Sequence, residues 1–276
     1  MRDTVIKLLT MLLVAFSVAS GSPDAHEILI QSVKVTEMNW IEAPNYSFTR
    51  ADTKTNRDHP PVKVVHEVRM IEGSPYLKII EEDGPLTMRR QAEEDQKLQG
   101  EMAKRSQESL REREKRTAKY RAERNRDHAI LMELADAFNY HVTGEQKVDG
   151  HDAWVLCGTP KAGYIPKSAE AKVLSGMTVN FWVDKGSYQW LRIEATVEKP
   201  VTLYGWLAKV GLGTKFILEQ APVSAKLWLP KHFNIQVNAS ALGFLNRNFT
   251  HDEIYLDYQP TPSLQAQSGT TVPRKN

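Results

Sequence analysis

Residues 177–197 read MTVNFWVDKGSYQWLRIEATV, and this stretch predicts a β-hairpin from its turn and its hydrophobic pattern together. Asp184-Lys185-Gly186 suits a three-residue loop that ends on a left-handed glycine, which would pair Val183 with Ser187 and Phe181 with Gln189. One face of the ribbon then carries Met177, Val179, Phe181, Val183, Leu191, Ile193, Ala195 and Val197, and the other carries Thr178, Asn180, Trp182, Tyr188, Trp190, Arg192 and Glu194. Because a one-residue slip would mix the two sets, we predict an antiparallel sheet with one dry face.

Many other segments show strand signals. Asp149-Gly150 is a two-residue hairpin turn, and residues 232–239 and 251–258 alternate between apolar and polar side chains. We expect strands at 46–53, 62–71, 76–81, 140–148, 153–159, 204–210, 214–220, 226–229, 231–239 and 253–258. The fold class is therefore α+β with a large antiparallel sheet.

Three segments read as helical. Residues 26–41 are amphipathic and end before Pro44, although their β-branched content leaves a strand as the competing interpretation. Within residues 86–137, the part from 93 to 127 is mostly charged with both signs interspersed, which is typical of a long solvated helix that projects from the body. A coiled-coil partner site and a basic nucleic-acid arm are the alternatives. Residues 128–138 regain an apolar face and are expected to dock onto the sheet.

The two ends of the chain predict export and a disordered tail. Arg2 and Lys7 precede an apolar run over 8–19 and then Ser20-Gly21-Ser22, a pattern typical of a secretory signal peptide over residues 1–21, cleaved near Ser20–Ser22. The run is shorter than the roughly 20 residues of a membrane span, although an uncleaved anchor or a buried first helix is the alternative. We therefore expect a periplasmic mature chain with no transmembrane segment. Residues 259–276 are rich in Pro, Ser, Gln and Thr and are expected to be disordered.

Charge and cysteine content restrict the function classes. The formal net charge is +2, and Arg2, Asp3 and Lys7 contribute part of it, so the mature chain is nearly neutral. This argues against nucleic-acid binding through bulk charge. Cys157 is the single cysteine, so no disulfide within the chain is possible, and its place in a predicted strand favours a buried, inert side chain.

Catalytic and metal signatures are weak. The chain contains no G-x-S-x-G elbow, no phosphate-binding loop and no H-E-x-x-H pair. His151-Asp152 and His251-Asp252-Glu253 carry ligand-type side chains, but each lies at a predicted turn or strand start, where solvated polar residues are common. We therefore expect no catalytic residue, no metal and no cofactor, and hence no enzyme.

The apolar face of the sheet remains as the candidate site. A long antiparallel sheet curls, and the segments 26–41 and 128–138 are the candidates to cover its concave side. If these helices fill the concavity, the apolar face is an ordinary core. If they cover it partly, a groove for an apolar ligand remains.

The chain contains two runs, FWVDKGSYQWLRIEA (181–195) and LWLPKHFNI (227–235), downstream of a signal peptide and helical segments. In this arrangement it resembles the LolA/LolB-like periplasmic lipoprotein-carrier superfamily and its uncharacterised bacterial relatives. The resemblance spans roughly 26–258 and implies an incomplete, curved antiparallel barrel whose helices lie over a hydrophobic cavity that receives acyl chains. Two features depart from it: the charged insertion within 86–137 is longer than usual, and no cysteine is available for lipid attachment, as in the soluble carriers.

Two functions follow as expectations. The first is an exported, non-enzymatic carrier or binding protein for a lipid or lipoprotein acyl chain in the cell envelope. Its expected cavity residues are Phe181, Leu191, Ile193, Phe216, Leu218, Ile235 and Val237. The second is an envelope protein–protein interaction or sensing module that uses the charged helix 93–127. The sequence leaves the cargo, the partner and the oligomeric state open.

Overall fold

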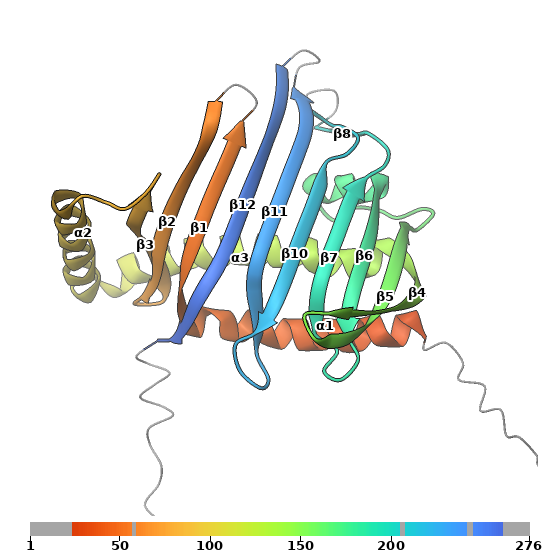
Figure 1. Ribbon diagram of the computed structural model, residues 1–276, viewed down its shortest axis with the longest axis horizontal. Helices are drawn as coiled ribbons and strands as arrows, with labels where there is room; N and C mark the ends of the chain where they lie inside the picture. Colours follow the sequence, from red (N-terminus) through yellow and green to blue (C-terminus); the bar gives the residue numbers. More distant parts are fainter. Residues whose placement is uncertain (1–23, 57–58, 205–207, 242–244, 262–276) are drawn as a thin grey trace, which may run out of the picture.

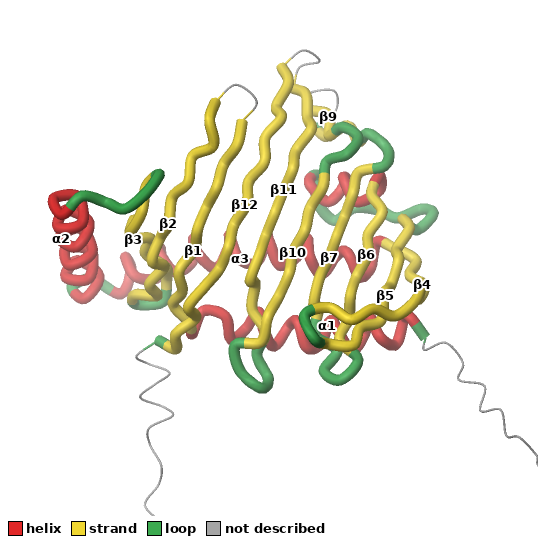
Figure 2. Tube along the Cα trace, viewed as in Figure 1, coloured by secondary structure: helices red, strands yellow, loops and turns green. Residues whose placement is uncertain are grey.

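The protein is built on one large antiparallel sheet that does not close on itself. The computed structural model describes residues 24–56, 59–204, 208–241 and 245–261, so the predicted signal peptide and residues 262–276 of the predicted tail lie outside the described residues. The main path of the sheet runs β3-β2-β1-β12-β11-β10-β7-β6-β5-β4, and the short strands β8 and β9 attach beside β11. Helices α1 and α3 cross its concave face (Figure 1; Figure 2). This confirms the predicted α+β class with an incomplete barrel.

The strands follow the chain in three groups. The first is β1 (Tyr46–Asn56), β2 (His59–Ile71) and β3 (Ser74–Glu82). The second is β4 (Phe138–Val148), β5 (His151–Pro160), β6 (Met177–Asp184) and β7 (Trp190–Val197). The third is β8 (Val201–Leu203), β9 (Ala208–Val210), β10 (Lys215–Pro222), β11 (Trp228–Ala241) and β12 (Leu245–Pro260). The two segments predicted at 226–229 and 231–239 thus merge into the single strand β11, and the strand predicted at 204–210 is replaced by the short pair β8 and β9.

Helix α1 (Ala25–Glu42) confirms the prediction of a helix over 26–41. The Asp24 side chain accepts a hydrogen bond from the backbone N–H of His26 and begins the helix, and Pro44 follows its end in the short 3-10 helix η1 (Ala43–Asn45). The buried stripe comprises Ala25, Ile28, Leu29, Ser32, Thr36 and Asn39. Met38 and Ile41, which the sequence pattern places beside this stripe, are exposed.

The charged segment forms two helices, so the prediction of one long projecting helix is wrong. Helix α2 (Met88–Ser106) lies beyond the edge strand β3, and α3 (Leu110–Ala137) crosses the concave face (Figure 1). Ser109 separates them because its side chain caps α3, in a capping box that it shares with Glu112. None of the helices in the described residues is both long and apolar enough to span a membrane.

Two arginines, one buried and one partly exposed, fasten these helices to the turn between β2 and β3. Arg105 of α2 donates to the backbone oxygens of Ile71 (3.0 Å), Ser74 (2.8 Å) and Pro75 (3.3 Å). Arg116 of α3 donates to the Ser74 hydroxyl (2.6 Å) and pairs with Glu108. A guanidinium can satisfy several carbonyl oxygens at once, so this charged segment is docked through its own cations.

The central hairpin of β6 and β7 forms as predicted, but its register differs. Phe181 pairs with Ile193, four residues beyond the predicted partner Gln189, and Val183 pairs with Trp190. The register also shifts at this end of the hairpin, as in a β-bulge. The bulge turns Trp190 onto the concave face and Leu191 onto the convex one, which reverses the predicted assignment of these two side chains.

The turn chemistry explains the longer loop. The Asp184 carboxylate accepts hydrogen bonds from the backbone N–H groups of Gly186 (3.0 Å) and Ser187 (2.7 Å), so the chain curls around this side chain. Tyr188, with φ of 58°, is the residue in the left-handed conformation, in place of the predicted Gly186. The wider turn therefore moves the return strand along its partner.

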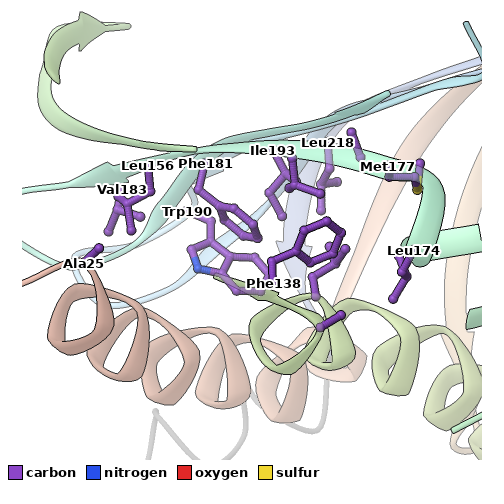
Figure 3. Packing of buried hydrophobic residues seen from close by; sticks show 14 of the residues in the cluster. Ala25, Phe138, Leu156, Leu174, Met177, Phe181, Val183, Trp190, Ile193 and Leu218 are labelled. Atoms are coloured by element: carbon purple, nitrogen blue, oxygen red, sulfur yellow. The ribbon is translucent and has the colours of Figure 1, made fainter. Parts of the chain in front are cut away.

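The core lies where α1, the C-terminal half of α3 and the 3-10 helix η2 (Glu170–Gly176) meet strands β4 to β7 (Figure 3). Tyr140 and Phe181 pack edge to face with ring centroids 5.5 Å apart, and Phe181 and Trp190 do so at 5.2 Å. Phe138, Phe181 and Trp190 are almost fully buried. Full burial of such rings is the largest single contribution that a side chain makes to a core of this kind.

We expect Trp190→Ala to lower the free energy of unfolding by about 3–5 kcal/mol, since it leaves a large cavity among buried rings. Trp182 in the same hairpin is the matched control, because it lies on the convex face, half-buried, with its ring nitrogen bonded to Gln146. Trp182→Ala should cost less than half as much in urea-induced unfolding. Equal losses for the two variants would contradict the observed register.

We expect Arg105→Lys to lower the free energy of unfolding by about 1–3 kcal/mol, because an ammonium cannot reach the three carbonyl oxygens of the turn together. Amide hydrogen exchange over residues 88–106 should become faster. Arg111→Lys, at an exposed position of α3, is the control and should change neither measurement. Unchanged exchange in Arg105→Lys would show that α2 is held by other contacts.

Candidate functional site

The concave face changes character along the sheet from apolar to charged. Directly paired residues of antiparallel strands share one face, so rows of side chains can be followed from strand to strand. The first row reads Leu156, Phe181, Ile193, Leu218, Phe233, Glu253, Asp52, Val64 from β5 to β2. The second reads Gly158, Val179, Ala195, Phe216, Ile235, His251, Lys54, Val62. Both rows pass from a sealed core to polar side chains at β12 and β1.

Between these two ends lies a set of partly exposed apolar side chains, which we call the apolar strip. It consists of Phe216 on β10, Phe233, Ile235 and Val237 on β11, and Phe249 on β12. Phe216 and Phe233 pack edge to face at 5.3 Å and touch the margin of the core, whereas Phe249 at the far end is 39% exposed. The strip is therefore an extension of the core that the helices leave partly uncovered.

The positions of the helices explain this opening. The backbone of α1 comes closest to β4, and that of α3 comes closest to β3 and to η2. Arg124 of α3 donates to the backbone oxygen of Trp40 and lies above its ring, and His128 stacks on the same ring at 4.4 Å. The two helices are thus joined to each other, and α1 also reaches the start of β11, where Asn39 accepts a hydrogen bond from the backbone N–H of Trp228 (3.1 Å).

Next to the apolar strip lies a cluster of ionisable side chains, which we call the carboxylate–histidine cluster: Asp52, His66, His251 and Glu253. His251 Nε2 lies 3.2 Å from Asp52 Oδ1 and 3.3 Å from Glu253 Oε1, and His66 Nδ1 lies 2.9 Å from Asp52 Oδ2. The strip and the cluster meet directly, because Ile235 pairs with His251 across β11 and β12.

The electrostatics of this cluster keep the Asp52 carboxyl ionised. Burial raises the pKa of the Asp52 carboxyl, but hydrogen bonds from His66 and Arg50 more than offset this effect and bring the pKa to about 2. Arg50 Nε lies 3.0 Å from Asp52 Oδ2. Burial, followed by the neighbouring Glu253 carboxylate, raises the pKa of the Tyr255 phenol, whose hydroxyl donates to Glu253.

The predicted cavity residues separate into three groups. Phe181, Ile193 and Leu218 are buried in the packed core. Leu191 faces the other way and packs with Ala153 and Trp228 on the convex side, because of the bulge in β7. Phe216, Ile235 and Val237 lie half-buried on the apolar strip, so the structure brings these three together at an accessible surface.

Sequence reasoning missed Phe233, Phe249 and the carboxylate–histidine cluster. Strand alternation signals the first two, since Phe233 shares a face with Ile235 and Phe249 shares one with His251. The same alternation puts His251 and Glu253 on one face. Asp52 is the residue that the sequence pattern could not supply, because its strand β1 pairs with β12 from the opposite end of the chain.

Two pockets in the described residues lie away from the strip. One, of about 890 Å³, opens at the ends of β1, β2 and β12, with Phe48, Arg69, Met102 and Arg113 in its wall. The other, of about 350 Å³, lies between α3 and the segment at 167–170. None of the predicted cavity residues lines either pocket, and mixed charges line both of them.

No protein-family model and no curated protein matches the chain. Solved structures with a similar fold include a LolA superfamily protein from Nitrosomonas europaea, 11% identical with a TM-score of 0.33, over 86% of this chain and 93% of that one. A putative outer membrane lipoprotein-sorting protein domain from Vibrio parahaemolyticus is 11% identical with a TM-score of 0.31, over 89% and 95%. A DUF1329 family protein from Desulfovibrio piger is 13% identical with a TM-score of 0.32, over 85% and 92%.

Proposed function

We propose that the protein is an exported, non-enzymatic binding protein or carrier for the acyl chain of a lipid or lipoprotein in the cell envelope. The observation that carries this proposal is the apolar strip, whose half-exposed side chains continue the sealed rows of the core. An exposed apolar surface of this kind on the concave face is suited to contact with a flexible hydrocarbon. The proposed contact residues are Phe216, Phe233, Ile235, Val237 and Phe249.

The energetics favour a single extended chain on this surface. Each methylene removed from water contributes about 0.8 kcal/mol, so an acyl chain must bury many methylenes to offset the cost of association. Phe181, Ile193 and Leu218 form the closed end of the same rows and would limit how far the hydrocarbon enters. The carboxylate–histidine cluster borders the strip on its other side and offers polar partners for a headgroup.

Export to the periplasm is part of this proposal and rests on the predicted signal peptide at residues 1–21. The residues directly after that segment contain no cysteine, and the carrier proposed here is one that is not itself lipid-anchored. Lipid transfer between membranes needs reversible contact, and a partly open apolar surface exchanges its ligand more readily than an enclosed cavity does.

The alternative is a protein–protein or sensing role for the charged segment 93–127. Its specific support is the exposure of two apolar side chains within this charged surface, Leu110 at 79% and Met102 at 40%. A photo-crosslinker at position 110 should then capture one envelope protein in living cells, while the same probe at Leu256 on the convex face should not. Capture from both positions would point to collisions rather than to a docking surface.

The acyl-chain proposal predicts that the folded protein binds a fluorescent fatty-acid probe and that unlabelled fatty acid displaces this probe. Ile235→Asp should weaken probe binding at least about tenfold. The introduced Asp carboxylate would keep about two methylenes of the bound chain in contact with water, which weakens the binding free energy by about 1.6 kcal/mol. Probe titration followed by fluorescence gives both affinities, and circular dichroism verifies the fold of the variant.

Ile254→Asp is the matched control, because Ile254 lies on the neighbouring strand, is 42% exposed and faces the convex side. Its probe affinity should remain that of the unaltered protein. Absence of saturable probe uptake by the folded chain would exclude the carrier proposal. Equal losses in Ile235→Asp and Ile254→Asp would place the binding surface elsewhere.

A further inference from the structure

One ring nitrogen on the concave face lies close to two carboxylates at once. The same nitrogen of His251, Nε2, points at Asp52 Oδ1 (3.2 Å) and at Glu253 Oε1 (3.3 Å). A ring nitrogen carries at most one proton, so it can serve only one of these oxygens well. The 3.2 Å contact with Asp52 lies at the long end of the hydrogen-bond range, and the 3.3 Å contact with Glu253 lies just beyond it.

The separations match the edges of a metal coordination polyhedron. A tetrahedral zinc ion with bonds of 2.0–2.1 Å holds neighbouring ligand atoms about 3.3–3.5 Å apart. The Asp52, His251 and Glu253 ligand atoms all lie within 4.8 Å of one another, so side-chain movement could bring all three onto one ion. We propose that these three residues bind a divalent transition-metal ion of the Zn²⁺ class.

The surrounding groups orient both carboxylates toward this point. Oδ2 of Asp52, the oxygen that faces away from His251, accepts hydrogen bonds from His66 and Arg50. The second oxygen of Glu253 accepts one from the Tyr255 hydroxyl. Each acid therefore presents its remaining oxygen to the same side of His251, and outer partners of this kind are typical of metal-binding carboxylates.

The backbone holds the ligands in place. Asp52 and Glu253 are a directly paired couple on β1 and β12, and His251 lies two residues before Glu253 on the same face. The three side chains are 8%, 13% and 21% exposed, so they are sheltered yet reachable from solvent. A nitrogen ligand with two carboxylates favours zinc-like ions over Mg²⁺ and Ca²⁺, which prefer oxygen alone. Three protein ligands also leave one tetrahedral position for water or an anionic group.

The convex face provides an internal comparison. His232 also contacts two carboxylates, but through different nitrogens: Nδ1 lies 3.3 Å from Glu219 and Nε2 lies 2.7 Å from Asp252. The two acids thus approach opposite sides of the ring and cannot share one ion with it. His232 therefore belongs to an ordinary hydrogen-bonded network and is a suitable control position.

The test is calorimetric titration of the untagged, chelator-treated mature chain with Zn²⁺ alone. We expect saturable binding of one ion per chain, at least tenfold weaker binding in His251→Ala and in Asp52→Asn, and no change in His232→Ala. Co²⁺ in place of Zn²⁺ should give the visible absorption of a four-coordinate nitrogen–oxygen site. Mg²⁺ should not compete.

Thermal unfolding with and without Zn²⁺ separates a lost site from a lost fold: the unaltered chain and His232→Ala should gain stability from Zn²⁺, and His251→Ala should unfold normally but gain none. Three outcomes would overturn the proposal: no saturable binding, equal affinity in His251→Ala, or loss of binding in His232→Ala. None of these readouts involves the fatty-acid probe, so the outcome is independent of the acyl-chain proposal.

Discussion

Removal of water from one end of the concave face is the interaction on which this structure depends. Trp190, Phe181 and Phe138 gather there against α1 and the end of α3, and almost no solvent reaches them (Figure 3). Rings of this size each remove a large apolar area from water, which stabilises the contact between the helices and the sheet. The rest of the sheet extends from this sealed end, strand by strand, toward an open edge at β3.

Charge limits how far that sealed region can spread. At β12 and β1 the same rows of side chains present Glu253 and Asp52 instead of leucine and phenylalanine. Burying ionised carboxylates beneath an apolar helix would cost several kcal/mol for each ion. The two helices instead join each other through Trp40 and Arg124. The apolar strip lies between the buried core and these charged side chains, which is why the helices cover it only partly.

The candidate site was partly predictable. Phe216, Ile235 and Val237 were identified because strand alternation assigns alternate residues to one face without knowledge of the partner strands. Leu191 was assigned to the wrong face because a bulge reverses the alternation, and this bulge follows from the way Asp184 holds its turn. The carboxylate–histidine cluster escaped prediction because Asp52 and Glu253 are about two hundred residues apart in the chain and become neighbours only through the pairing of β1 with β12.

The sequence by itself determined the α+β class, most of the strands, helix α1 and the turn at Asp149-Gly150, because each depends on local periodicity, a cap or a tight turn. Even the break in the charged segment was encoded locally, in the capping box of Ser109 and Glu112. Only the tertiary structure decided the docking of α2 and α3 through Arg105 and Arg116, and which part of the concave face stays open. These features depend on contacts between distant segments, and no local pattern specifies the distance at which such segments meet.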